Sequence, residues 1–299
     1  MQQQSMTRRR FLSRSAIVGA AVIGGPTLLS ACGGGEEDVA TLERAREEGF
    51  IRVGFANEAP YGFADAAGVL TGESPEVARA VFARLGVEEM DGVLTEFGSL
   101  IPGLQARRFD LVAAGMFITP ERCEQVLFSD PSYCAPQAFL VQGGNPLGLT
   151  DYASVADNPD VRLGVLTGAV EAEQARANGV ADGQIETLGD PPSLLQALQS
   201  DRIDAVALTT ISLNDLLETA GADSGLEVTD SFIAVIDGEE QLGCGGFAFH
   251  QDDEDFRNAF NEVLNEMKQN GELIPIVEGF GFAEAAEAGT DVTAEELCG

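Results

Sequence analysis

The sequence predicts an α/β fold of two lobes, and three observations lead to this expectation. Short apolar runs alternate with helical patterns, as at 109–114, which indicates parallel strands covered by helices. The alternation occurs twice, first before about residue 130 and again from residue 161 onward. Roughly 260 residues follow the N-terminal segment, which is long for a single hydrophobic core.

The first 32 residues have the features of a bacterial export signal. Thr7-Arg8-Arg9-Arg10-Phe11-Leu12 is a twin-arginine pattern, and the apolar run 16–29 is too short and glycine-rich for a membrane span. Leu29-Ser30-Ala31-Cys32 matches the box at which lipoproteins are cleaved and lipidated on the cysteine. We therefore expect a signal peptide at 1–32, lipidation at Cys32, a flexible tether at 33–40 and anchoring to the outer face of the cytoplasmic membrane. The alternative is an ordinary signal peptide with a chance cysteine.

The chain is strongly acidic, with a net charge of -32 and Lys268 as its one lysine. Such a surface repels nucleic acid and anionic membranes, so we expect no nucleic-acid partner and contact with a membrane through the lipid alone. The charge also suits an exported protein in a saline medium. His250 is the one histidine, and without clustered ligands we expect no metal and no cofactor.

Four cysteines remain if Cys32 is lipidated: Cys123, Cys134, Cys244 and Cys298. Four cysteines allow three pairings, and the sequence does not choose among them. Free buried thiols are a further possibility.

In the first half, the loops after three expected strands carry the candidate site residues. We expect helices at 41–49, 74–85 with Ser74 as N-cap, and 100–109, and strands at 51–55, 93–96 and 109–114. Parallel strands joined by helices bring the loops at their carboxyl ends to one rim. That rim receives Glu58, Tyr61, Phe97 and Phe117, together with Arg122 in a helix start capped by Thr119.

The second half repeats this pattern. Strands are expected at 161–166, 185–188 and 203–208, with Thr209 at the tip of the last, and the turn 167–171 opens a helix whose backbone N–H groups can bind an anion. Residues 241–249 return to the first lobe, followed by a helix at 255–270. The expected domains are lobe 1 at 41–136 plus 242–282, lobe 2 at 137–241, and an acidic, mobile tail at 283–299.

One stretch carries a family resemblance. The sequence S-L-I-P-G-L at 99–104, with R-F-D-L-V-A-A-G-M-F-I-T-P-E-R at 108–122, resembles the polar-solute-binding proteins of ABC importers, the branch that includes amino-acid-binding proteins. G-F-A-N-E-A-P-Y-G-F-A-D at 54–65 and L-T-E-F-G-S-L-I-P-G-L at 94–104 are similar to its ectoine- and hydroxyectoine-binding members. The resemblance covers about 41–282. It implies the periplasmic-binding-protein type II fold, two α/β lobes joined by a two-strand hinge.

The resemblance suggests roles for the rim residues. Arg122 would grip a carboxylate with its planar fork, and Tyr61, Phe97 and Phe117 would surround a cation, which gains about 0.5–2 kcal/mol over aromatic faces. Glu58 would neutralise that cation. The alternative is that each phenylalanine is only core packing and that the arginine is a surface residue paired with an acid.

Two departures from the amino-acid-binding relatives narrow the ligand, and a third concerns the start of the second-lobe helix. Those proteins usually carry serine or threonine where Phe117 stands and an acid where Thr209 stands, so a free α-ammonium would be poorly paired here. Their hydroxyl donor at the second-lobe helix start is replaced by Ala169 and Val170, which leaves backbone N–H groups. The expected ligand-binding residues are Glu58, Tyr61, Phe97, Phe117, Thr119, Arg122, Gly168, Ala169, Val170 and Thr209.

The expected function is a monomeric, non-enzymatic substrate-binding lipoprotein of an ABC importer. It would capture ectoine or hydroxyectoine in the inter-lobe cleft and deliver the solute to permease subunits. The first alternative is a receptor for a polar amino acid or another betaine-like zwitterion. The second is an enzyme like cyclohexadienyl dehydratase on the same fold, for which the rim motifs offer Glu58 but no histidine or lysine.

Overall fold

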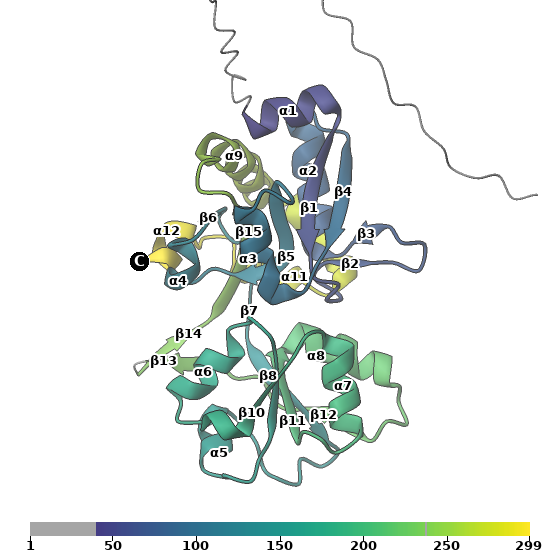
Figure 1. Ribbon diagram of the computed structural model, residues 1–299, viewed down its shortest axis with the longest axis vertical. Coiled ribbons are helices and arrows are strands. Elements are labelled where there is room, and N and C mark those ends of the chain that lie inside the picture. The colour runs from purple at the N-terminus through teal and green to yellow at the C-terminus, as the bar shows by residue number, and fades with distance from the viewer. Residues whose placement is uncertain (1–39, 237) are drawn as a thin grey trace, which may run out of the picture. The chain divides into compact units, whose positions relative to one another are not determined.

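The computed structural model describes residues 40–236 and 238–299. In this part the strands form two main sheets in separate lobes, and the chain passes between them at β7 (Tyr133–Ala135), as Figure 1 shows. The expected export signal with Cys32, and the tether up to residue 39, lie outside the described residues. The α/β fold class predicted from the sequence is confirmed.

The sheet of the first lobe has the strand order β4-β1-β5-β15-β6, and β7 also pairs with β15. β1, β4 and β5 are parallel, whereas β15 runs antiparallel to β5. β5 is buried along nearly its whole length, as expected of a strand covered on both faces. The strands are β1 (Phe50–Phe55), β4 (Glu89–Leu94), β5 (Leu111–Phe117), β6 (Leu127–Phe128) and β15 (Gly243–Phe249), with a side hairpin of β2 (Phe63–Ala64) and β3 (Leu70–Thr71).

The helices of the first lobe pack through apolar stripes. Phe260 of α9 lies 4.7 Å from Phe247 of β15 and 5.5 Å from Phe82 of α2, measured between ring centroids, so both helices are fixed against the sheet. The buried apolar residues of α9 follow helical spacing: Phe256, Phe260, Leu264 and Met267. The helices are α1 (Thr41–Glu48), α2 (Glu73–Leu85), α3 (Leu100–Gln105), α9 (Glu254–Asn270) and α10 (Leu273–Val277), with 3-10 turns η1 (Phe97–Ser99) and η3 (Glu278–Phe280).

The sheet of the second lobe has the order β10-β9-β11-β8-β12, in which β8 runs antiparallel to β11 and β12. Asp151, Asp190 and Thr209 begin three of its helices, and their side-chain oxygens accept backbone N–H groups of the first turn. The strands are β8 (Gln137–Gln142), β9 (Leu163–Leu166), β10 (Ile185–Leu188), β11 (Ala205–Thr209) and β12 (Leu226–Val228). The helices are α5 (Tyr152–Ala156), α6 (Glu171–Ala177), α7 (Pro191–Gln199) and α8 (Thr210–Ala220), with a 3-10 turn η2 (Asp182–Gln184).

The chain crosses between the lobes twice, from β7 to β8 and from the strand pair β13 (Ala234–Ile236) and β14 (Glu239–Gln241) to β15. A disulfide joins Cys134 of β7 to Cys244 of β15 at this crossing. We propose the lobe boundaries 41–136 plus 242–282 and 137–241, because every strand of the first sheet falls in the former set and every strand of the second in the latter.

Several local predictions in the first lobe are wrong. The helix expected at 100–109 ends at Gln105, and the strand expected at 93–96 is β4, Glu89–Leu94. Ser74 is not a helix cap but lies within α2, where its Oγ donates to Glu73 Oε2 at 2.6 Å and accepts the Gly115 N–H at 3.0 Å. β5 does not end at Ala114 but continues to Phe117, because its last residues pair with β15. Phe117 is therefore the end of a strand and not part of a loop.

The acidic tail is also different from the mobile segment that its composition suggested. It forms α11 (Ala283–Ala288) and α12 (Ala294–Cys298), in keeping with the high helix propensity of alanine and glutamate. Phe282 and Ala286 are fully buried in the first lobe. Cys298 forms a disulfide with Cys123 of α4 (Pro120–Cys123).

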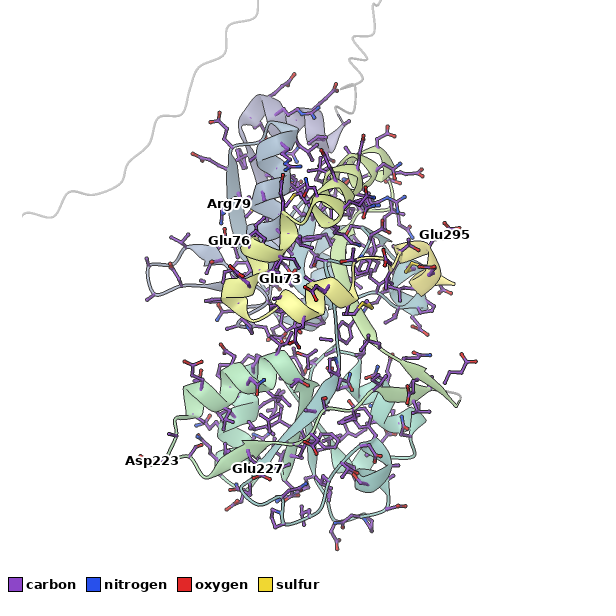
Figure 2. The ribbon with its side chains drawn as sticks, turned by 180° about the vertical axis from the view of Figure 1, so that it is seen from behind. Glu73, Glu76, Arg79, Asp223, Glu227 and Glu295 are labelled. Atoms are coloured by element: carbon purple, nitrogen blue, oxygen red, sulfur yellow. A yellow bond between two sulfur atoms is a disulfide. The ribbon has the colours of Figure 1, made fainter. Side chains whose placement is uncertain are left out.

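The surface of the described residues carries many acids, and Asp223 and Glu295 point outward in Figure 2. Glu73 is an exception because it is fully buried. No helix in the described ranges combines the length and the apolar character needed to cross a bilayer.

Candidate ligand-binding site

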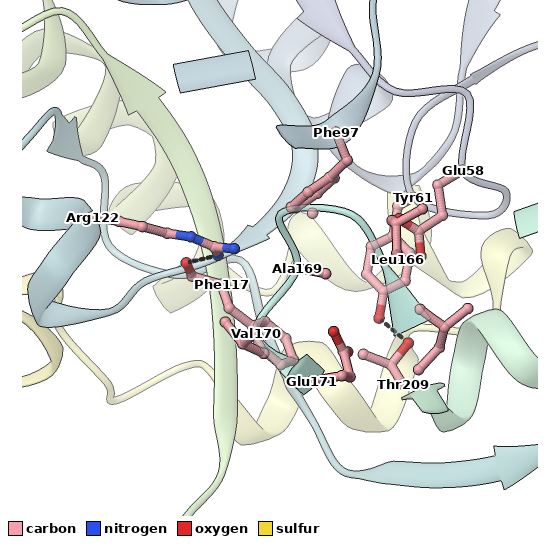
Figure 3. Close-up of a pocket in the computed structure, with 12 residues that line it drawn as sticks. Glu58, Tyr61, Phe97, Phe117, Arg122, Leu166, Ala169, Val170, Glu171 and Thr209 are labelled. Atoms are coloured by element: carbon pink, nitrogen blue, oxygen red, sulfur yellow. Dashed lines mark hydrogen bonds between the residues drawn. The ribbon is translucent and has the colours of Figure 1, made fainter. Parts of the chain in front are cut away.

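A pocket between the two lobes gathers residues from six separate segments (Figure 3). It holds about 350 Å³ of space not filled by protein atoms, a volume that includes open solvent at its mouth. The first lobe contributes Glu58, Tyr61, Phe97, Gly115, Phe117 and Arg122, and the second contributes Leu166, Ala169, Val170, Glu171, Leu208 and Thr209. The parallel strands β1, β4 and β5 deliver the first set from their carboxyl ends.

Arg122 is held in place by backbone atoms of both lobes. Its Nη1 donates to the Phe117 carbonyl oxygen at 2.6 Å and its Nη2 to the Gly168 carbonyl oxygen at 3.0 Å. Thr119 caps the short helix α4 by accepting the Arg122 N–H. Burial lowers the pKa of the guanidinium below its ordinary value. A guanidinium has more N–H donors than these two bonds use, so donors of Arg122 remain for a further acceptor.

Three aromatic side chains wall the first-lobe side of the pocket. Phe97, Phe117 and Tyr61 are all buried, and the Arg122 guanidinium carbon lies 5.6 Å from the centroid of the Phe97 ring. The Tyr61 ring packs against Phe282 at 4.8 Å between centroids in an edge-on contact. These contacts hold the Phe97 and Tyr61 rings in place.

Gly115 explains how the Tyr61 ring fits beneath the pocket. Its φ of +61° is in the left-handed region, and a Cβ atom at this position would lie 2.1 Å from the Tyr61 ring. A side chain there is therefore excluded by both conformation and space.

Two buried carboxyl groups face the pocket from opposite lobes. Glu58 Oε1 accepts the Ser212 hydroxyl at 2.7 Å, and burial raises the pKa of this carboxyl to about 7. Burial likewise raises the pKa of Glu171 to about 7, with a further increase from Glu58 and an opposing effect of Arg122. Glu171 Oε2 is buried and has no hydrogen-bond partner among the described residues.

Three hydrogen bonds join the lobes across the pocket. The Tyr61 hydroxyl donates to Thr209 Oγ1 at 2.8 Å, and the Ser212–Glu58 and Arg122–Gly168 bonds also connect the two lobes. At the pocket edge the backbones of Gly98 and Gly168 approach so closely that a Cβ on Gly168 would lie 2.4 Å from the Gly98 Cα. These contacts link the two lobes at the pocket.

All but two of the ligand-binding residues expected from the sequence line this pocket; Thr119 and Gly168 border it and hold Arg122 instead. The Ala169 N–H, expected to meet an anion, donates to the Leu166 carbonyl oxygen at 3.1 Å and is engaged within its own turn. Sequence reasoning missed Glu171 and Ser212. The expected anion-binding turn 167–171 included Glu171 but gave its side chain no role, and an acid in a first helical turn was the available signal.

Two α/β lobes that close over a small pocket with a buried arginine, aromatic walls and two carboxyls define a receptor for a small polar solute. A family model, bacterial extracellular solute-binding proteins, family 3, matches residues 51–282. The chain belongs to this family, and the expected two-lobed periplasmic-binding-protein fold is confirmed.

Known proteins agree with this assignment. A probable amino-acid ABC transporter periplasmic-binding protein, y4tE, of Sinorhizobium fredii is 37% identical over 262 residues, which covers 86% of each chain. The arginine-binding extracellular protein ArtP of Bacillus subtilis is 30% identical over 209 residues, covering 68% of this chain and 75% of ArtP. The crystal structure of EhuB in complex with hydroxyectoine has 40% identity and a TM-score of 0.79, covering 86% of this chain and 97% of that one.

The chain is thus a solute-binding protein of an ABC importer, with a small-molecule ligand and permease subunits as its partners. Its relatives are named as binding proteins and not as enzymes.

Proposed function

We propose that this protein binds ectoine or hydroxyectoine, zwitterions in which a carboxylate is attached to a cyclic amidinium. The observation that carries the proposal is the arrangement of Arg122 beside the Phe97 face, with Phe117, Tyr61 and Glu58 around the same pocket. The ligand carboxylate would pair with Arg122, while the delocalised cation lies against the aromatic rings. The similarity to EhuB, which was crystallised with hydroxyectoine, supports this ligand class.

The test is a panel of thermal unfolding measurements followed by calorimetry. The panel contains ectoine, hydroxyectoine, glycine betaine, proline, glutamine and arginine. A ligand at a hundred times its dissociation constant stabilises the fold by about 2.7 kcal/mol. We expect ectoine or hydroxyectoine to give the largest shift and the tightest binding. Tighter binding of glutamine or arginine would overturn the proposal.

A polar amino acid is the second candidate, and Glu171 is the observation that favours it. This buried acid lies beside Thr209 in the pocket (Figure 3), so it can pair an α-ammonium where the sequence suggested that no acid was present. The names of y4tE and ArtP point the same way. The same panel separates the two candidates.

We also propose that the mature protein is anchored by lipid on Cys32. The proposal rests on the twin-arginine pattern and on the Leu29-Ser30-Ala31-Cys32 box. Cys32→Ser should move the protein from the membrane fraction to the soluble fraction, or leave it unprocessed. Membrane retention of mature Cys32→Ser protein would refute the lipid anchor.

A further inference from the structure

Glu171 is a buried acid in the first turn of a helix at the pocket. It is the first residue of α6, its side chain is 4% exposed, and it lines the pocket. Figure 3 shows the side chain pointing into the pocket between Val170 and Thr209. Its Oε2 is the buried side-chain atom that finds no hydrogen-bond partner among the described residues.

An unpaired buried carboxyl oxygen destabilises a fold, so its presence calls for a partner. The Tyr61 hydroxyl donates to Thr209 Oγ1, and the Arg122 nitrogens that donate to carbonyl oxygens make no hydrogen bond to Glu171. A structural carboxyl would instead resemble Glu73, which accepts hydroxyl groups on both of its oxygens. A bound solute with an N–H group can supply the donor that Glu171 Oε2 lacks.

Glu171 does not act alone, because Glu58 faces the same pocket from the other lobe. Glu58 is held by Ser212 on α8, whereas Glu171 stands on α6. A solute that fills the pocket thus lies between two carboxyl groups, with Arg122 as the cation for its own carboxylate.

We propose that Glu58 and Glu171 form a two-carboxyl acceptor pair, which selects solutes whose cation carries N–H donors on two sides and rejects fully methylated cations. The proposal rests on the proposed function and names the chemical feature by which that site discriminates. An amidinium or a guanidinium meets the requirement. A quaternary ammonium does not, although its charge suits the aromatic walls.

The discrimination follows from the two kinds of contact in the pocket. The rings of Phe97, Phe117 and Tyr61 attract any cation, methylated or not. The carboxyls gain from a cation as well, but a methylated one leaves them desolvated without hydrogen bonds. A site with buried acceptors rejects a ligand that lacks the matching donors more strongly than a purely apolar site does.

The experiment measures binding of ectoine, arginine and glycine betaine by calorimetry to the parent protein and to Glu171→Gln. Glutamine keeps the shape of the side chain, removes its charge and adds an amide donor. For a solute with N–H donors we expect the variant to bind about ten- to a hundred-fold more weakly. Betaine should bind the parent weakly and lose clearly less affinity than ectoine or arginine, since it loses the attraction of the charge but no hydrogen bond.

Two controls separate ligand recognition from structure. Glu173→Gln removes the same charge from the exposed side of α6 and should change affinity by less than about threefold. The melting temperature of the ligand-free Glu171→Gln protein should equal or exceed that of the parent, because the amide oxygen of glutamine can still accept the backbone N–H of residue 171. A clearly lower melting temperature would mean that Glu171 is structural, and would overturn the inference.

The remaining outcomes distinguish this inference from the proposed function. If arginine binds in place of ectoine and Glu171→Gln weakens it, the proposed ligand is wrong but the acceptor pair stands. If ectoine binds the parent and Glu171→Gln equally well, water satisfies the carboxyl. The inference is then wrong, while the proposed function stands. Binding of betaine as tightly as ectoine by the parent would also overturn it.

Discussion

Replacement of Glu73 by glutamine should change the free energy of unfolding in a pH-dependent way. The variant should be less stable than the parent at pH 5 and more stable than the parent at pH 8. Glu73 begins α2 and is fully buried beneath the pocket-lining strands. Its two carboxyl oxygens accept the Ser74 hydroxyl at 2.6 Å and the Ser132 hydroxyl at 2.7 Å. Burial raises the pKa of Glu73 to about 7, and the two hydroxyl donors oppose that increase.

The sign and size of the effect follow from linkage between protonation and folding. In the unfolded chain a glutamate titrates near pH 4.3, so the folded protein holds this proton more tightly. The stability that the neutral carboxyl contributes is complete below about pH 4 and is lost as the pH rises through about 7. Between pH 5 and pH 8 the loss from this one group is about 2.5 kcal/mol. Glutamine stays neutral, so the variant escapes the loss and carries only a pH-independent cost of about 1 kcal/mol for altered hydrogen bonds.

Urea unfolding of both proteins at pH 5 and pH 8 measures this difference directly. The matched control is Glu76→Gln. Glu76 lies about one helical turn after Glu73 on α2, and Figure 2 labels both residues. Glu76 is partly exposed and pairs with Arg79 at 3.3 Å, so its replacement removes the same charge without burial. An equal effect of Glu73→Gln on the free energy of unfolding at both pH values would refute burial as the cause.

Four further substitutions test the site and its support. Arg122→Ala should weaken ectoine binding by about 2–5 kcal/mol in calorimetry, because the ligand carboxylate stays buried without its partner; a loss below about tenfold would contradict the carboxylate role. Phe97→Leu and Phe117→Leu keep apolar volume but lose the π-face, and each should weaken ectoine binding by about 1–2 kcal/mol. Unchanged affinity would mean that the rings only pack against their neighbours. Cys298→Ser removes the disulfide to Cys123 and should lower the free energy of unfolding by about 2–4 kcal/mol. Proteolysis of α12 should also become faster. An unchanged cleavage rate would show that packing alone holds the tail in place.

The convergence of the first-lobe residues could be predicted from the sequence. Glu58, Phe97 and Arg122 follow three apolar strands in succession, and parallel strands joined by helices have their carboxyl ends on one rim. The cap at Thr119 followed from local chemistry too. These inferences needed only short stretches and a general rule of topology.

Contacts between lobes could not be predicted in the same way. The bonds from Ser212 to Glu58 and from Tyr61 to Thr209 join residues 154 and 148 positions apart, and they depend on how two sheets meet. No local pattern encodes that orientation. The prediction of a mobile tail was wrong for a related reason. An acidic, alanine-rich composition is compatible with a mobile segment and with a helix, and the disulfide from Cys298 to the distant Cys123 holds the tail in an ordered helix.

The charges around the pocket restrict the ligand more than any single motif does. The described pocket residues include the cation of Arg122 and the carboxyls of Glu58 and Glu171, all buried. A neutral solute leaves these groups without ionic partners, and an anionic solute is repelled by the two acids. A simple cation leaves Arg122 unpaired. A zwitterion pairs all three when its carboxylate lies at Arg122 and its cation between the acids, and N–H donors on that cation satisfy the Glu171 oxygen that the protein leaves without a partner.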